Sequence, residues 1–202
     1  MFYLHPRQHQ TKTITVSQLI EEYHLKKRDF SRVNLAQTSV TDINLSDIKL
    51  SGANLSDINL SHAVLQNADL SEANLSGAAL WRTDLRHANL KLAKCSNALL
   101  ICANLNESNL SGSLLADAEM RLTSLVGADL SGANLSGANL SYADLSSANL
   151  SGANLTGTVL TGANLAGADF SKTNLSKTIL FRTNLSLAIL PSPRADLTLA
   201  AS

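Results

Sequence analysis

The sequence is poor in several features that usually reveal a protein's chemistry. Aromatic residues make up 4% of its 202 residues, it has two cysteines, and its 16 basic and 16 acidic residues cancel. A neutral chain has no overall field that attracts nucleic acid, so we expect no direct nucleic-acid binding. Because it lacks both an 18-residue apolar run and an apolar stretch after a basic start, we expect no membrane span, no signal peptide and a cytoplasmic location.

Sequence motifs for catalysis are also missing. The chain contains no Walker loop, no dinucleotide fingerprint, no HExxH and no CxxC. His62 and His87 have no second ligand at zinc spacing. We therefore expect no enzymatic activity, no metal, no cofactor and no small-molecule substrate.

A five-residue repeat occupies most of the chain. Between Ser131 and Leu155 it reads SGANL SGANL SYADL SSANL SGANL, and 33 consecutive units run from Phe30 to Leu190. We call the position of the final Leu i; 28 of the 33 units carry Leu there. A helix turns about 140° net in five residues, so it would scatter these leucines around its axis. The repeat therefore excludes a helix, and the in-out-in alternation of Ala-Asn-Leu predicts a very short strand.

The residues after each Leu predict a corner. All ten glycines fall at i+2, which is typical of a bend with positive φ or a close approach of backbones. Units of this kind cannot bury an apolar face alone and must stack. Cys95 lies at an inward i position and Cys102 at an outward i+2 position, so we expect no disulfide between them. Asn and Asp at i−1 are expected to bond the corner backbone.

The repeated A-(N/D)-L-S-G unit resembles the pentapeptide-repeat family over residues 30 to 190. The resemblance implies an all-β protein: a right-handed, four-sided parallel β-helix with one repeat per side, four per coil and about eight coils. It also implies a bacterial source. Some proteins of this family mimic the shape and charge of a DNA duplex and bind gyrase, protecting it from quinolones.

A short capping α-helix is predicted before the repeats. Thr15 and Gln18 form a capping box, and a helix from about Val16 to Lys26 would bury Leu19 against the first coil. Such a cap covers the open end of a stack. The predicted division of the chain is a mobile segment 1–13, a capping helix 14–27, a repeat β-helix 28–190 and a C-terminal cap or tail 191–202.

One outer side differs from the other three when residues 20 apart are compared. On that side, Trp, Tyr, Phe, Arg and aliphatic residues replace the usual polar ones. Aromatic residues and Arg are enriched at binding hot spots, and an exposed apolar strip usually marks an interface. We call this predicted interaction surface the strip. It consists of Trp81, Arg82, Leu99, Ile101, Arg121, Leu122, Tyr142, Phe181 and Arg182.

The strip predicts a non-catalytic scaffold that binds a protein partner or a second copy of itself. The strip could instead be covered by the chain's own termini. The basic residues around Arg86 and Lys91 fall on at least three sides, which favours a solvated surface over an anion site. The alternative function, a gyrase-binding DNA mimic, needs a strongly negative rod. Residues 30 to 190 carry 12 acidic and 10 basic residues, which argues against it.

Overall fold

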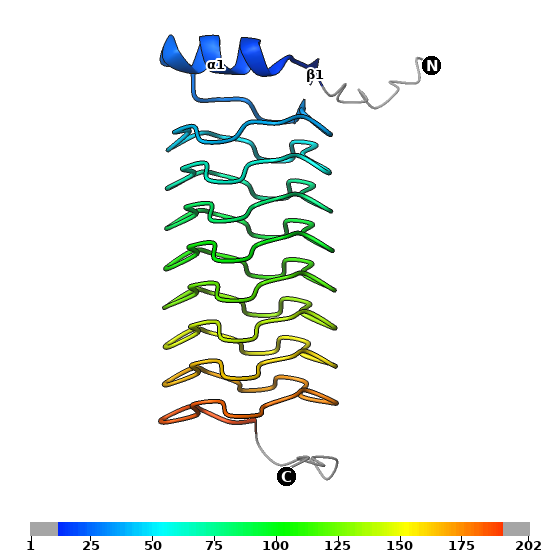
Figure 1. The fold of residues 1–202 in the computed structure, drawn as a ribbon, viewed down its shortest axis with the longest axis vertical. Coiled ribbons are helices and arrows are strands. Elements are labelled where there is room, and N and C mark those ends of the chain that lie inside the picture. Colours follow the sequence, from blue (N-terminus) through cyan, green and yellow to red (C-terminus); the bar gives the residue numbers. More distant parts are fainter. Residues whose placement is uncertain (1–11, 192–202) are drawn as a thin grey trace, which may run out of the picture.

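The protein is a stack of coils with a helix across one end. The computed structural model describes residues 12–191. Its elements are β1 (Lys12–Thr13), α1 (Val16–His24) and β2 (Val33–Asn34). The repeats wind away from α1 to form a rod, with the blue helix at one end and the red repeats at the other (Figure 1).

Parallel backbone pairing holds successive coils together. Single bridges join i−1 residues that are 20 apart, as in the series Asn34, Asn54 and Asn74. Because 20 residues are four repeats, the bridges fall into four series along the rod. The strand predicted in each repeat is reduced to one bridged residue, since the chain turns again within five residues. Between residues 12 and 191, only β1 and β2 are longer strands, and they pair in parallel.

Each repeat satisfies its backbone donors in a regular way. In a typical repeat such as residues 54–58, four of the five N–H groups donate to backbone carbonyls. The fifth, at i+1, donates to the side chain at i−1: the N–H of Ser131 lies 3.0 Å from Asp129 Oδ1, and that of Ser141 lies 3.1 Å from Asn139 Oδ1. The prediction that Asn and Asp at i−1 bond the corner backbone is confirmed.

Every corner from Arg32 to Leu187 places its i+2 residue at positive φ. The ten glycines have φ between 62° and 71°, and Arg, Asp, Asn, Leu and Tyr adopt the same region at other corners. Val, Ile and Thr never occupy i+2 in these repeats. Branched side chains are the ones that this backbone region disfavours most, so the corner geometry limits the residues allowed there.

The core is a set of buried ladders inside the rod. The i residues from Phe30 to Phe170 are buried, together with most of the small i−2 residues. The hydroxyl of Thr123 is satisfied there by donating to Leu100 O at 2.9 Å. Both cysteines are free; Cys95 is buried, which raises the pKa of its thiol to about 12, and Cys102 is half-buried.

Helix α1 covers the first coil. Its predicted capping box is present, because Thr15 and Gln18 each accept from the other's backbone N–H. Leu19 is 1% exposed, and the Tyr23 hydroxyl donates to Ser46 O at 2.9 Å. The helix ends at His24, before the predicted end at Lys26, because Lys26 itself adopts φ 71° and breaks the helical backbone.

The structure also changes the predicted boundaries. The predicted mobile segment 1–13 includes Lys12 and Thr13, which form β1 and pair with Val33 and Asn34. Their polar composition concealed this, because backbone pairing needs no apolar side chain. Residues 1–11, and the predicted C-terminal cap from residue 192 onward, lie outside the described residues.

Candidate interaction surface

The structure brings the residues of the strip onto one outer side. The i−1 residues of this side form one bridge series through Ala79, Leu99, Glu119, Asn139 and Val159. The corner residues that follow them lie on the same side of successive coils. The exposed apolar side chains of the strip are Trp81 at 44%, Leu99 at 44%, Leu122 at 58%, Tyr142 at 64% and Phe181 at 52%. Ile101 is half-buried, and all three arginines are exposed.

Aromatic and cationic groups are stacked on each other within the strip. The Trp81 ring meets the His62 ring edge to face, with centroids 5.4 Å apart, and the Arg82 guanidinium lies 5.0 Å from the Trp81 centroid. The Arg182 guanidinium lies 5.1 Å from the Phe181 centroid. These contacts hold the long side chains near the surface, which lowers the entropy that a partner must remove on binding.

A glycine makes room for the most exposed ring of the strip. A Cβ placed on Gly162 would come within 2.6 Å of Cδ1 and Cε1 of Tyr142. The ring therefore lies over the next corner of the same side. Tyr142 keeps most of its surface exposed in this position, and its orientation depends on the missing side chain at residue 162.

Several repeats on the side of the strip lack the side-chain acceptor that completes other repeats. Ala79, Leu99 and Val159 stand at i−1 in place of Asn or Asp. The N–H groups at the following i+1 residues, including those of Trp81 and Ile101, have no protein acceptor among residues 12–191. An unpaired backbone donor must bond water or a partner. These repeats thus have an apolar side chain in place of an internal hydrogen bond; Leu99 is exposed, and Ala79 and Val159 are half-buried.

Charges on the same side are arranged unevenly. Arg121 Nε lies 3.2 Å from Glu119 Oε2, so these two charges neutralise each other. Asp42, Arg82 and Arg182 have no ion-pair partner within the described part of the chain. Asp42 and Arg182 stand at the two ends of the side, which leaves one free charge of each sign there.

Exposed leucines also lie outside the strip, and two of them, in the middle of the rod, were not predicted from the sequence. Leu92 and Leu114 are 50% and 43% exposed and belong to other sides. Leu92 reaches over the next corner, since a Cβ on Gly112 would lie 2.8 Å from its Cδ2. Leu114 replaces the consensus Asn at i−1, and that departure from the repeat could have identified it. Exposed Ile179, beside Phe181, extends the strip by the same substitution.

Two of the basic residues beside the strip lie next to acidic side chains. Arg86 makes a salt bridge to Asp84 at 2.8 Å, and the hydrogen bonds from Arg86 hold the pKa of that carboxyl below its usual value. His87 Nδ1 lies 3.4 Å from Glu107 Oε2. A solvated surface, as predicted, fits these pairs better than an anion site does.

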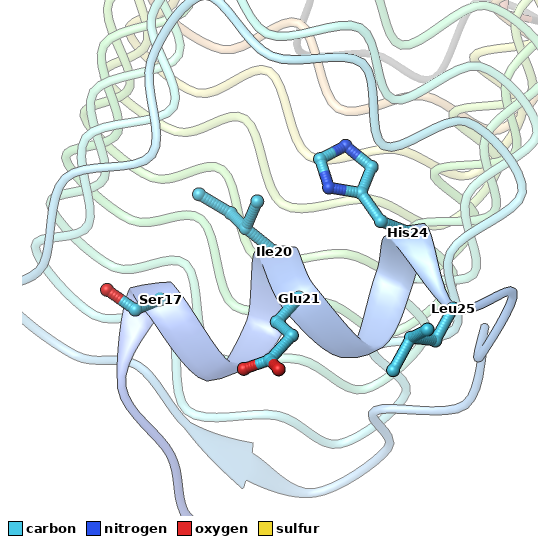
Figure 2. Close-up of a pocket in the computed structure, with 5 residues that line it drawn as sticks. All are labelled: Ser17, Ile20, Glu21, His24 and Leu25. Atoms are coloured by element: carbon cyan, nitrogen blue, oxygen red, sulfur yellow. The ribbon is translucent and has the colours of Figure 1, made fainter.

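Other candidate sites are weaker. A hollow beside α1 is lined by Ser17, Ile20, Glu21, His24 and Leu25 (Figure 2). Within residues 12–191, no three His, Cys, Asp or Glu side chains gather as metal ligands would. Helix α1, the one helix described between these residues, is not long and apolar enough to cross a membrane.

Acidic side chains in the repeat ladders are separated by amides. Asn89 Nδ2 donates to Asp69 Oδ1 at 3.1 Å, and Asn149 Nδ2 donates to Asp129 Oδ1 at the same distance. Each of these carboxylates therefore accepts a hydrogen bond from an amide on the next coil. These ladders do not place two carboxylates side by side, as glycoside hydrolysis would need.

Solved structures similar to this chain are pentapeptide repeat proteins. HetL, which is involved in heterocyst differentiation regulation in the cyanobacterium Nostoc sp. strain PCC 7120, is 32% identical; the match covers 90% of this chain and 99% of HetL, with a TM-score of 0.32. The protein alr5209 from Nostoc PCC 7120 is 32% identical over 70% of this chain and 84% of its own, with a TM-score of 0.37.

A trypsin-treated variant of QnrB1, a plasmid-mediated fluoroquinolone resistance protein, is 19% identical. Its match covers 76% of this chain and 85% of QnrB1, with a TM-score of 0.55. At this identity the likeness concerns the fold alone. No curated protein sequence matches the chain. The family model for pentapeptide repeats matches overlapping segments that together span residues 29–186. The chain therefore belongs to the pentapeptide-repeat family.

Proposed function

We propose that this protein is a non-catalytic scaffold that binds a protein partner, a second copy of itself included, through the strip. Trp81, Tyr142 and Phe181 would supply the buried contacts of the interface, because large rings contribute much contact area at low entropic cost. Arg82 and Arg182 would add directional hydrogen bonds at the edges. The unbonded N–H groups of the strip would find acceptors on the partner.

The proposal includes the finer geometry of the rod, which is a right-handed, four-sided winding of about eight coils. The four series of parallel bridges at 20-residue spacing support the four sides. A regular winding gives the strip a straight line of corners, so that side chains far apart in sequence can contact one flat partner surface.

The observation that carries the proposal is that apolar residues replace Asn or Asp at i−1 more often on one side than on the others. On that side they are Ala79, Leu99, Val159 and Ile179, whereas the other three sides together have Val64, Leu114 and Ile189. Each replacement gives up a hydrogen bond worth about 0.5–1.5 kcal/mol. Elsewhere the chain mostly keeps this bond, for example at Asn134 and Asn154. Giving it up repeatedly on one side, and exposing Leu99 and Ile179 there, indicates a surface used for binding.

Leu99→Asn is expected to weaken partner capture or self-association at least about tenfold without loss of the fold. The substitution removes an apolar contact at the centre of the strip and supplies the acceptor that the N–H of Ile101 lacks. Captured proteins can be quantified by mass spectrometry after pull-down from cell extract, self-association by sedimentation, and the fold by circular dichroism.

The matched control is Leu114→Asn. Leu114 is also an exposed leucine at i−1, with 43% exposure against 44% for Leu99, but it belongs to another side. We expect this variant to bind as the wild type does. Equal binding by the wild type, Leu99→Asn and Leu114→Asn would mean that the strip is not an interface. The strip would then be either covered by the chain's own termini or an ordinary exposed surface.

A second candidate function is the binding of gyrase by DNA mimicry. The fold likeness to QnrB1 supports it, but the 12 acidic and 10 basic residues between residues 30 and 190 give a far weaker negative field than a duplex has. We expect no inhibition of gyrase supercoiling at about micromolar protein, the range of ordinary specific binding. Inhibition that survives Leu99→Asn would favour this candidate over the scaffold.

A further inference from the structure

We propose that the partner of the strip is a second copy of this chain, packed antiparallel about a two-fold axis. The axis lies in the interface, perpendicular to the rod, between the coils of Leu100 and Met120. This inference rests on the proposed function, because it assigns an occupant to the same strip. Its basis is that the strip is complementary to itself when its order is reversed.

The symmetry dictates which residues meet. A two-fold axis across the rod reverses the order of the coils but keeps each repeat position opposite the same repeat position. Corner residues at i+2 therefore face corner residues at i+2 of the other copy. The resulting pairs are Asp42 with Arg182, His62 with Gly162, Arg82 with Tyr142, and Cys102 with Leu122.

The end pairs are complementary in charge. Asp42 and Arg182 are exposed, and neither has an ion-pair partner among residues 12–191. Antiparallel packing brings these opposite charges together twice, once at each end of the interface. Arg182 is already held on Phe181, with 5.1 Å between guanidinium and ring centroid, so it loses little freedom on pairing.

The inner pairs are complementary in chemistry and size. Arg82 meets the exposed ring of Tyr142, a cation–π pair. His62 lies opposite Gly162, which has no side chain to oppose the imidazole. At the centre, Leu99 and Ile101 face Glu119 and Arg121 of the other copy.

The central charges do not prevent this packing. Glu119 and Arg121 neutralise each other in a bond of 3.2 Å, so they present mainly their methylene groups to the apolar side chains opposite. The unbonded N–H of Ile101 lies in the same central region and can find an acceptor there.

Other arrangements of two copies fit less well. Moving the axis by half a coil leaves the corner at one end of the strip without an opposite corner in the other copy. It also separates Asp42 from Arg182. Parallel packing opposes each coil to its own copy, so that Arg82 and Arg182 each meet a coil with the same charge. Like charges facing each other disfavour that arrangement.

The expected interface is modest. Eight coils at about 4.8 Å spacing give a strip of about 34 Å in length. One side of such a rod lies at the low end of the areas that specific interfaces bury, so dissociation constants of about 1–100 µM are expected.

Charge exchange tests the register. Sedimentation velocity on the full chain, from about 1 to 200 µM, should show a concentration-dependent dimer. Asp42→Arg and Arg182→Asp should each weaken it about tenfold, because each introduces two repulsive contacts. The double variant Asp42→Arg/Arg182→Asp should recover the wild-type dissociation constant within about threefold. The control Asp117→Arg changes the same kind of corner residue on another side and should dimerise normally.

The outcomes separate this inference from the proposed function. A wild type that stays monomeric overturns the dimer, as does a double variant no stronger than the single ones. If the monomeric protein still captures another protein and Leu99→Asn abolishes that capture, the scaffold function stands without the dimer. If a dimer forms but neither Leu99→Asn nor charge reversal weakens it, the dimer uses another surface and this inference fails; the scaffold function also fails if Leu99→Asn leaves partner capture unchanged.

Discussion

Replacing Leu110 by alanine is expected to lower the free energy of unfolding by about 2–5 kcal/mol. Leu110 is fully buried at an i position in the middle of the rod. The coils above and below are tied to it by backbone bonds: its own N–H donates to Asp129 O at 2.7 Å. The ladders cannot move inward to fill the space, so the substitution leaves a cavity.

Urea denaturation followed by far-UV circular dichroism and by Trp81 fluorescence measures this loss. The two probes also test whether coils distant from Leu110 unfold together with it. The control Leu92→Ala removes the same atoms from a corner where the side chain is 50% exposed, and its cost should stay below about 1 kcal/mol. Equal losses in the two variants would contradict a core carried by the inward ladders.

Gly137→Val should destabilise the protein by about 2–3 kcal/mol. Gly137 has φ 71°, and a Cβ there would meet Asp117 Oδ1 at 2.3 Å. A branched side chain is poorly tolerated at this backbone conformation, and the Asp117 side chain must also move away. The same denaturation experiment measures the effect.

The paired control is Gly132→Asn. Gly132 has φ 65°, and no atom lies within 4 Å of its added Cβ. Asparagine already occupies this corner position at Asn67 and Asn97, with φ 57° and 58°. The expected cost is below about 1 kcal/mol, because Asn tolerates the left-handed region. A loss as large as that of Gly137→Val would show that these corners require glycine whatever the side chain.

The repeat made much of the fold predictable. Leucines at five-residue spacing exclude a helix by arithmetic, and the buried i residues, such as Leu70 and Leu130, are those that the period assigns to the inside. The capping box at Thr15 and Gln18 was equally local, since both partners lie within one helical turn. Features of this kind depend on neighbours in sequence.

The exposed surface was only partly predictable. Trp81 and Tyr142 could be assigned to one side because the family resemblance supplied four repeats per coil. Leu114 escaped notice, since a single departure on an otherwise regular side has little weight. The pairing of Lys12 with Val33 was also missed, because a two-residue strand of polar composition has no pattern of its own.

The period, the inward ladders and the bends at the i+2 glycines follow from the sequence alone, because they depend on local backbone geometry repeated in register. Only the tertiary structure decided which corners stack on which. That stacking places Tyr142 over Gly162, separates Leu99 from Leu114, and leaves Asp42 and Arg182 at opposite ends of one side, without an ion-pair partner among residues 12–191. These are relations between residues about 20 or more positions apart, set by backbone bonds between coils.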